Sequence, residues 1–484
     1  MESVQQNYIG GTWVPAGATA PNVNPSNLND VIANYARAQP AEAEAAIAAA
    51  KAAFPAYSRS TPQERYEALK KISDEILARK DELGRLLSRE EGKTLPEGIG
   101  EVVRAGQIFA FFAGESVRIS GEKIASIRPG IDIEVTREPV GVVALITPWN
   151  FPIAIPAWKI APALAYGNCV VFKPADLVPG SAHVLAEIIS RSGLPAGAFN
   201  LVMGRGSEIG DTLLQHPDVA AVSFTGSVAT GRKVAAAATA ATPMKKVQLE
   251  MGGKNPLVVL DDADVKIAVE CATNGAFFST GQRCTASSRL IVTKGIHDRF
   301  VGALTERMKT LVVDDALKTG THLGPVVDQS QLDQDLSYIA VGKNEGAKLH
   351  WGGEILNRET PGFYLQPTLF TGVDNRMRIA REEIFGPVAS VIQVKDYEEA
   401  VAAANDTDFG LSAGICTTSL KYASHFKRNA EAGMVMVNLP TAGVDYHVPF
   451  GGRKSSSYGP REQGRYAVEF YTTVKTAYVY PGSP

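Results

Sequence analysis

Four short, almost uninterrupted apolar runs follow one another in the first half of the chain. Each ends in glycine, proline or polar residues, and helical patterns lie between several of them: GVVALITP (141–148), GNCVVFKP (167–174), AFNLVMG (198–204) and VAAVSFTG (219–226). A strand that is apolar along its whole length is buried on both faces. These runs therefore predict a parallel sheet with helices packed on each side.

A second series of the same kind follows residue 250. Its strand candidates are NPLVVLDDAD, SSRLIVTKG, PVASVIQVKD, LSAGICTTS and GMVMVN, with helical segments between them. Residues 1–35 predict short strands and turns, and residues 40–116 have apolar residues at helical spacing. Alternation within residues 117–140 predicts an exposed β-ribbon, and the alternating C-terminus predicts an edge strand. The pattern is that of an α/β protein.

Composition narrows the class of protein. The formal net charge of −3 gives no reason to expect nucleic acid or an anionic membrane as a partner. We find neither a signal peptide nor an apolar run of the roughly 18 residues that span a membrane. The four cysteines are too few for a disulfide framework, and no cysteine or histidine motif indicates a metal site. We therefore expect a cytoplasmic protein that binds no metal.

Cys284, in STGQRCTASS, differs from the other cysteines. Cys169, Cys271 and Cys416 lie in apolar or small-residue runs, where a free cysteine is usually a buried small hydrophobe. Cys284 instead lies in a polar turn that could project it into a cleft. It follows Arg283, a cation of the kind that can lower a thiol pKa. Local sequence leaves two alternatives open, a nucleophile or one more small buried side chain.

A cysteine nucleophile needs a base and hydrogen-bond donors for the developing oxyanion. Glu250, in LEMGGKNP, is a candidate base, and Asn150, in PWNFP, is a candidate donor. Each has an ordinary alternative, a helix or turn carboxylate for Glu250 and a cap or turn residue for Asn150.

Polar and glycine residues follow three strands of the first series, at the edge where a doubly wound sheet binds its ligand. Lys173 and Asp176 follow one strand, Gly206 the next, and Gly226 with Ser227 the last. Lys173 and Asp176 could bind ribose hydroxyls, and free N–H groups near Gly226 could bind a phosphate. The G-x-G-x-x-G fingerprint is absent, so plain turns and a solvated lysine stay open as alternatives.

Together these stretches resemble the aldehyde dehydrogenase family over essentially the whole chain. The motifs occur in the family's order and spacing: PWNFP, FKPA, FTGS, LEMGGKNP, GQRCTA, EEIFGPV, NDTDFGLSAGI and PFGGRKSSSYGPREQG. The resemblance implies two Rossmann-type doubly wound domains plus a β-ribbon oligomerisation element, in a homodimer or homotetramer. The implied parts are an NAD(P)-binding domain (1–120 and 141–250), a catalytic domain (251–445) and the oligomerisation element (121–140 and 465–484).

The resemblance also implies roles for the motif residues. Cys284 is expected to attack the aldehyde, Asn150 to help form the oxyanion hole, and Glu250 to activate the water that releases a free acid. Lys173 is expected to be both a catalytic and a cofactor-binding residue. The implied cofactor-binding residues are Trp149, Lys173, Asp176, Gly206, Gly226, Ser227, Glu383 and Phe385. Asp176 should repel a 2′-phosphate but is short, so we expect NAD to be preferred and NADP to be tolerated.

Sequence details favour a carboxylated aldehyde as the substrate. Stretches such as GAFFSTGQRCTASSR and AGVDYHVPFGGRKSSS are most similar to family members that oxidise 2-oxoglutarate semialdehyde (2,5-dioxopentanoate) in sugar-acid breakdown. Arg104 falls on the helix lining the family's substrate tunnel, where a substrate carboxylate would give it a partner. The other substrate-binding candidates are Trp158, Phe278 and Arg283. Alternatives are succinic, glutaric or neutral aldehydes, a structural ion pair for Arg104, and a non-catalytic member of the family.

Overall fold

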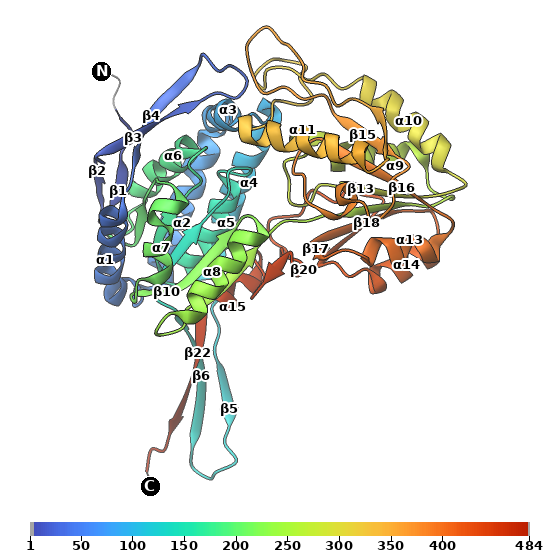
Figure 1. Ribbon diagram of the computed structural model, residues 1–484. Coiled ribbons are helices and arrows are strands. Elements are labelled where there is room, and N and C mark those ends of the chain that lie inside the picture. Colours follow the sequence, from blue (N-terminus) through green and yellow to red (C-terminus); the bar gives the residue numbers. More distant parts are fainter. Residues whose placement is uncertain (1–3, 483–484) are drawn as a thin grey trace.

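A computed structural model describes residues 4–482 and places two α/β units side by side, with a β-ribbon projecting from the first (Figure 1). Residues 1–3 and 483–484, at the ends of two predicted domain ranges, lie outside the described residues. Among the residues described, no helix combines the length and apolarity needed to cross a bilayer.

The first unit is built on an eight-stranded sheet of order β2-β1-β9-β8-β7-β10-β11-β21. The four predicted apolar runs form its parallel centre: β7 (Val142–Ile146), β8 (Cys169–Lys173), β9 (Phe199–Leu201) and β10 (Val219–Thr225). Parallel β11 (Lys246–Glu250) and the antiparallel strands β1 (Asn7–Ile9), β2 (Thr12–Val14) and β21 (Ser457–Tyr458) extend it. Strand order reverses between β7 and β10, so the ligand crevice of this sheet lies beyond their carboxyl ends.

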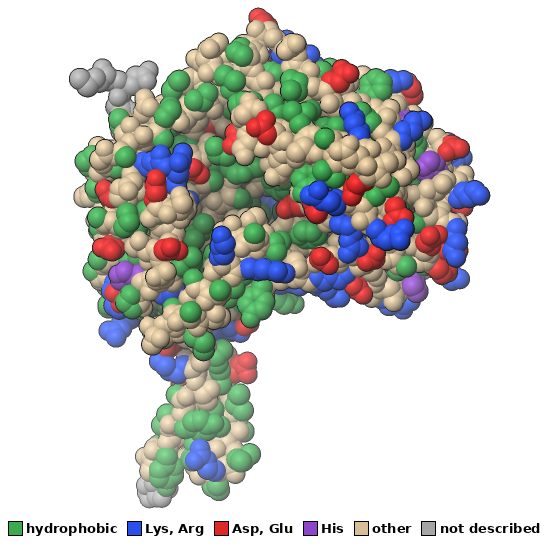
Figure 2. All heavy atoms as spheres, viewed as in Figure 1, with side chains coloured by type: hydrophobic (Ala, Val, Ile, Leu, Met, Phe, Trp, Pro, Cys, Tyr) green, Lys and Arg blue, Asp and Glu red, His purple; other side chains and the backbone are tan. Residues whose placement is uncertain are grey.

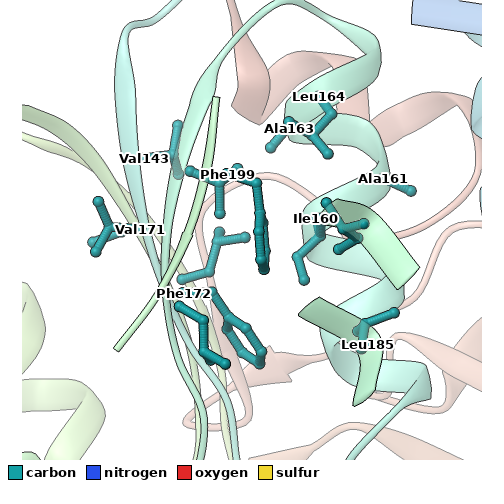
Figure 3. Packing of buried hydrophobic residues seen from close by; sticks show 14 of the residues in the cluster. Val143, Ile160, Ala161, Ala163, Leu164, Val171, Phe172, Leu185 and Phe199 are labelled. Carbon is teal, nitrogen blue, oxygen red and sulfur yellow. The ribbon is translucent and has the colours of Figure 1, made fainter. Parts of the chain in front are cut away.

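Helices cover both faces of this sheet (Figure 1). They are α1 (Pro40–Tyr57), α2 (Pro62–Ala78), α3 (Lys80–Glu91), α4 (Leu95–Ser116), α5 (Ala154–Ala165), α6 (Pro179–Ser190), α7 (Gly206–Gln215), α8 (Val228–Ala240) and α15 (Val468–Tyr471). Phe172 and Phe199 of the sheet point toward Ile160 of α5 and Leu185 of α6 (Figure 3). Burying each such side chain contributes about 1.5–3 kcal/mol, which explains why these strands are mostly apolar.

The second unit has a seven-stranded sheet of order β14-β15-β16-β13-β12-β18-β19, parallel except for β14. Its strands are β12 (Pro256–Val259), β13 (Arg289–Thr293), β14 (Lys348–Trp351), β15 (Thr368–Thr371), β16 (Val388–Val394), β18 (Ser412–Cys416) and β19 (Met434–Val437). Its helices are α9 (Val265–Phe277), α10 (His297–Lys309), α11 (Gln329–Asn344), α12 (Arg378–Arg381), α13 (Tyr397–Asn405) and α14 (Leu420–Asn429). The predicted second series is confirmed.

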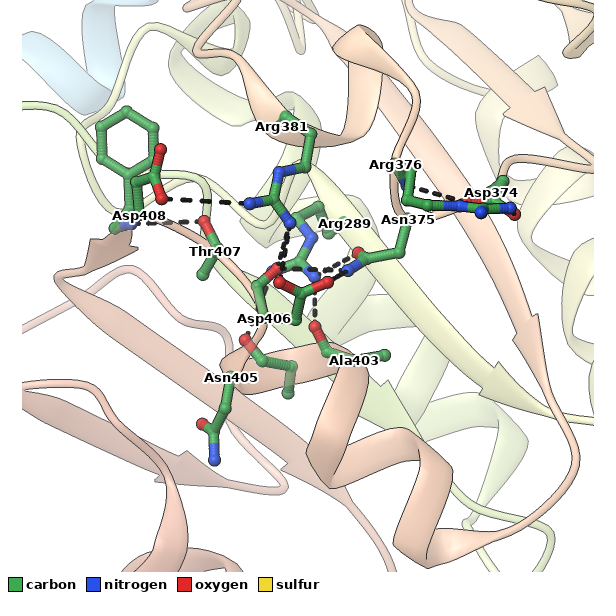
Figure 4. A network of polar contacts seen from close by, with 12 residues as sticks. Arg289, Asp374, Asn375, Arg376, Arg381, Ala403, Asn405, Asp406, Thr407 and Asp408 are labelled. Carbon is green, nitrogen blue, oxygen red and sulfur yellow. Dashed lines mark hydrogen bonds and ion pairs between the residues drawn. The ribbon is translucent and has the colours of Figure 1, made fainter.

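A buried arginine links β13 of this sheet to α13 and to the loop after β15. Arg289, at the start of β13, donates to the carbonyl oxygens of Ala403 and Ala404 at the end of α13 and to the Asn375 side chain (Figure 4). Asp406 beyond α13 accepts hydrogen bonds from Asn375 and Arg381. The network fixes the start of β13, the strand that follows the Cys284 loop.

Three smaller pairings complete the fold. An N-terminal pair consists of β3 (Ala18–Val23) and β4 (Val31–Arg37), and a short pair consists of β17 (Phe409–Gly410) and β20 (Arg453–Lys454). The ribbon consists of β5 (Glu122–Ala125), β6 (Asp132–Pro139) and the C-terminal β22 (Thr472–Val479), all antiparallel. The predicted ribbon and terminal strand thus pair with each other, and apolar side chains lie exposed along them (Figure 2).

Candidate active site

Cys284 lies in a sharply turned loop between the helical turn η1 (Phe278–Gly281) and β13. Residues 279–281 have φ values of 52°, 55° and 68°, a backbone region that residues other than glycine rarely adopt. Asn255 clamps the loop after the turn, because its Nδ2 donates to the carbonyls of Cys284 at 2.8 Å and Ala286 at 2.9 Å. The turn brings Cys284 to the surface of a cavity, and the residue as a whole is half-buried.

Asn150 follows β7, beside the point where the strand order of the first sheet reverses. Its Nδ2 donates to the carbonyl of Gln282, two residues before Cys284, at 3.0 Å. The amide carries a second hydrogen on Nδ2, which is available to an oxygen close to the thiol. The fold therefore brings together the candidate nucleophile and its candidate oxyanion donor, which are far apart in the sequence.

Two cavities meet at Cys284, and Ile155 is the other residue that lines both. The larger cavity, of about 420 Å³, is bordered by α4, α5 and the loop before Phe450. The smaller, of about 200 Å³, lies beyond the carboxyl ends of β7 and β10. A thiol at this junction can bond to a molecule in one cavity while facing a second molecule in the other.

Five of the predicted cofactor-binding residues line the smaller cavity: Trp149, Gly226, Ser227, Glu383 and Phe385. The rings of Trp149 and Phe385 are 5.4 Å apart and perpendicular. Glu383 accepts a hydrogen bond from the backbone N–H of Gly253 at 2.8 Å, and burial raises its pKa to about 7. A Cβ at position 226 would lie 2.5 Å from the ring of Phe224, so only glycine fits there.

Lys173, Asp176 and Gly206 lie outside this cavity but near one another on the same edge of the sheet. Lys173 is buried, donates to the carbonyl of Pro174 at 2.8 Å, and has its pKa lowered to about 8 by burial. A Cβ on Gly206 would lie 3.9 Å from its Cε. Asp176 is exposed, with Oδ2 3.7 Å from Nε of Arg205.

All four predicted substrate-binding residues line the larger cavity: Arg104, Trp158, Phe278 and Arg283. Arg104 donates to Oε1 of Gln463 at 3.2 Å, while its buried Nε has no hydrogen-bond partner. Its guanidinium lies 5.8 Å from the Trp158 ring, which stacks on Phe450 at 5.4 Å. Within residues 4–482, no carboxylate forms an ion pair with Arg104. A structural ion pair, one of the alternatives for this residue, is therefore not seen.

Comparisons with known proteins identify the family. A profile described as "Aldehyde dehydrogenase family" matches residues 13–477. The chain belongs to the aldehyde dehydrogenase family. It is 45% identical over 479 residues to alpha-ketoglutaric semialdehyde dehydrogenase of Bacillus subtilis (98% of each chain covered). It is 42% identical over 468 residues to 2,5-dioxopentanoate dehydrogenase of Saccharolobus solfataricus (96% of this chain and 97% of that one).

Among solved structures, betaine aldehyde dehydrogenase of Staphylococcus aureus in complex with NAD⁺ superposes with a TM-score of 0.96. It is 35% identical, and the match covers 99% of this chain and 95% of that one. The predicted family, fold class and class of enzyme are confirmed: the chain is an α/β aldehyde dehydrogenase.

Burial is the main influence on the electrostatics of the Cys284 thiol. Burial raises its pKa to about 12, and the nearby carboxylates of Glu383 and Glu250 add to the shift. The Arg283 guanidinium donates to the carbonyls of Asn274 and Gly275, and its charge does not offset the effect of burial on the thiol. The surroundings of Cys284 therefore favour the protonated thiol.

Glu250 is the last residue of β11 and is 2% exposed. Its Oε2 accepts a hydrogen bond from the hydroxyl of Ser457 on β21. Burial raises its pKa well above the usual range, and the carboxylate of Glu462, which is paired with buried Lys159, adds to this. Glu250 lines neither cavity, so to act on a molecule at Cys284 it must turn away from Ser457.

Several residues at this site were missed in the sequence. Ser457, Glu462 and Gln463 lie within the matched C-terminal motif, which was the available signal, but no role was drawn from it. Lys93 and Glu101 lie outside the matched motifs, and both line the larger cavity. No three His, Cys, Asp or Glu side chains of the described chain gather as metal ligands would.

Proposed function

We propose that this aldehyde dehydrogenase oxidises 2-oxoglutarate semialdehyde to 2-oxoglutarate with NAD. The observation that carries the proposal is Arg104, a partly buried arginine in the cavity that leads to Cys284, whose Nε has no hydrogen-bond partner and which forms no ion pair among the described residues. Burying an unpaired charge is costly, and a substrate carboxylate would compensate it. The names of the Bacillus and Saccharolobus relatives refer to this same substrate.

The charge of the cavity supports an anionic rather than a cationic aldehyde. Its lining includes three cations, Lys93, Arg104 and Arg283, against two carboxylates, Glu97 and Glu101, which leaves one positive charge in excess. Betaine aldehyde, named for the Staphylococcus neighbour, carries a permanent positive charge that this excess would repel.

The chain's own residues support a covalent mechanism. The Cys284 thiol gives its proton to solvent water, and Sγ bonds to the aldehyde carbon while the carbonyl electron pair moves onto oxygen. Nδ2 of Asn150 and the backbone N–H of Cys284 donate to that oxyanion. Loss of hydride from the carbon leaves a thioester on Cys284. Glu250 then takes a proton from water, and the resulting hydroxide attacks the thioester carbon. The C–S bond breaks, the acid is released, and Glu250 returns the proton to the Cys284 thiolate.

The smaller cavity fits a dinucleotide. It lies at the switch point of the first sheet, a glycine without room for Cβ stands at position 226, and Ser227 opens α8, whose first N–H groups suit a phosphate. Glu383 can accept from a ribose hydroxyl, and Trp149 and Phe385 can border the nicotinamide ring. When bound, NAD supplies the acceptor for the hydride.

We infer that the enzyme prefers NAD and tolerates NADP. Asp176, near Lys173, would repel a 2′-phosphate, but Arg205 lies within 3.7 Å of its carboxylate and offsets part of that repulsion. Asp176→Asn is expected to raise kcat/KM with NADP about tenfold, and the further change Arg205→Ala to remove that gain. The ratio of kcat/KM for NAD and NADP measures this. A wild-type enzyme equally efficient with both cofactors would contradict the inference.

We also propose that residues 1–120 and 141–250 bind the cofactor, while residues 251–445 supply Cys284. The ribbon is proposed to join subunits in a homodimer or homotetramer. Apolar side chains such as Ile124, Ile127 and Val474 are exposed on the ribbon, and its outer strands have open edges. The four cysteines are free thiols, which supports a reducing compartment such as the cytoplasm.

A substrate panel tests the proposed function. Wild type and Arg104→Ala are compared on 2-oxoglutarate semialdehyde, succinic semialdehyde and a neutral aldehyde of similar length. Loss of a charge-assisted hydrogen bond should lower kcat/KM for the carboxylated aldehydes about 10–100-fold. The neutral aldehyde, which makes no such bond, should be oxidised at an unchanged rate and so controls for folding and chemistry. The role of Arg104 is wrong if both enzymes keep the same preference.

A further inference from the structure

A buried ion pair lies against the loop that carries Asn150. Lys93, between α3 and α4, and Glu101, on α4, are joined by a 2.8 Å contact, and their side chains are 2% and 1% exposed. Neither belongs to the nucleophile, base or cofactor groups. A pair so completely removed from water persists only when its other hydrogen-bonding groups are also satisfied.

The ammonium group of Lys93 also contacts Asn150 and the residue after it. Its Nζ donates to the carbonyl oxygen of Asn150 at 2.7 Å and lies 3.8 Å from the centre of the Phe151 ring. Asn150 lies outside any helix or strand, so no regular ladder holds its backbone. Lys93 therefore fixes one end of the segment 150–154.

Glu101 holds the other end of the same segment. Its Oε1 accepts hydrogen bonds from the backbone N–H groups of Ile153 and Ala154, each at 3.0 Å. These donors lie at the N-terminus of α5, where N–H groups lack partners within the helix and a negative charge is favourable. Lys93 and Glu101 thus hold the two ends of the segment 150–154 by hydrogen bonds, and their charges neutralise each other.

We propose that the Lys93–Glu101 pair positions the oxyanion donor, by fixing residues 150–154 so that Nδ2 of Asn150 faces the oxygen of the aldehyde on Cys284. This inference rests on the proposed role of Asn150. Nδ2 must reach both the Gln282 carbonyl and the reacting oxygen, and a misplacement of about 1 Å can lower the rate about 10²-fold. Lys93 and Glu101 are positioning residues, because they act through Asn150.

A double-mutant cycle tests the proposal in the full-length enzyme. Asn150→Ala is expected to lower kcat about 10²–10³-fold, and Lys93→Met about 10²-fold, with little change in KM. In the Asn150→Ala background, Lys93→Met should cost less than about threefold, because the group that it positions is gone. Full additivity, or an effect on KM alone as for a direct substrate contact, would overturn the proposal.

Two further variants separate positioning from folding. Lys245→Met removes another buried lysine, whose Nζ donates to the carbonyls of His216 and Val219 at 2.6 and 2.7 Å, near the amino ends of the strands. Lys245→Met should keep the wild-type kcat.

Glu101→Gln is isosteric and should lower kcat in the same non-additive way as Lys93→Met. If Lys93→Met does not fold, Glu101→Gln tests the positioning of Asn150 in its place.

The proposed function and this inference fail differently. A wild-type enzyme that oxidises no aldehyde contradicts the proposed function. An active wild type, with Asn150→Ala impaired and Lys93→Met and Glu101→Gln both unimpaired, contradicts the positioning role alone.

Discussion

Cys284→Ser is expected to abolish NADH formation from every aldehyde, with kcat lowered on the order of 10⁴-fold or more, as when the nucleophile of a catalytic triad is removed. A serine hydroxyl is far harder to deprotonate than a thiol, and an ester on serine lacks the reactivity of a thioester. The loop should keep its shape, because Asn255 holds the backbone carbonyls of Cys284 and Ala286 rather than the thiol. NADH absorbance during steady-state turnover is the measurement.

Cys169 supplies the matched control for that result. It is a buried small side chain of β8, away from both cavities. Cys169→Ala should lose some stability and keep the wild-type kcat. Unchanged dinucleotide binding by Cys284→Ser would show that its fold is intact. The nucleophile assignment is wrong if Cys284→Ser retains more than a few per cent of activity.

Glu250→Gln is expected to lower steady-state turnover about 10²–10⁴-fold, the range for loss of a general base, while leaving the first turnover largely intact. Hydride loss precedes the hydrolysis that Glu250 serves, so rapid mixing should show a burst of about one NADH per active site followed by a slow phase. The thioester accumulates on Cys284, which intact-protein mass spectrometry detects.

The pH dependence of the slow step has a defined sign. Burial and Glu462 raise the pKa of Glu250, and only its deprotonated form accepts a proton from water. Hydrolysis in the wild type should therefore accelerate as pH rises through that raised pKa, and this dependence should vanish in Glu250→Gln. A Glu250→Gln enzyme without a burst would instead place Glu250 in the deprotonation of Cys284.

Much of the fold was predictable because its central strands are buried on both faces. An apolar run such as VAAVSFTG can bury the side chains of both its faces only in a sheet that is covered on each side. This run forms β10. The two-residue strand β21 could not be predicted, because it is too short to show a pattern and its position depends on pairing with β11. It nevertheless supplies Ser457, which holds Glu250.

Local sequence was least informative where side-chain direction matters. Arg283 precedes Cys284, but its guanidinium donates to carbonyls near the end of α9, and adjacency in the chain alone did not show this direction. Lys93 and Asn150 are 57 positions apart, and their contact exists only because α4 packs on α5. Cys284 itself was ambiguous until Asn150, Glu250 and the cofactor motifs were considered together.

The central claim is that Cys284 and NAD convert a carboxylated semialdehyde into a free acid. It is tested most directly by following NADH and 2-oxoglutarate together when the purified protein receives NAD and 2-oxoglutarate semialdehyde. We predict that the two products form in equal amounts, with kcat/KM at least about tenfold higher than for betaine aldehyde or a neutral aldehyde. NADH formation without the acid, a preference for betaine aldehyde, or no NADH from any aldehyde would contradict the account.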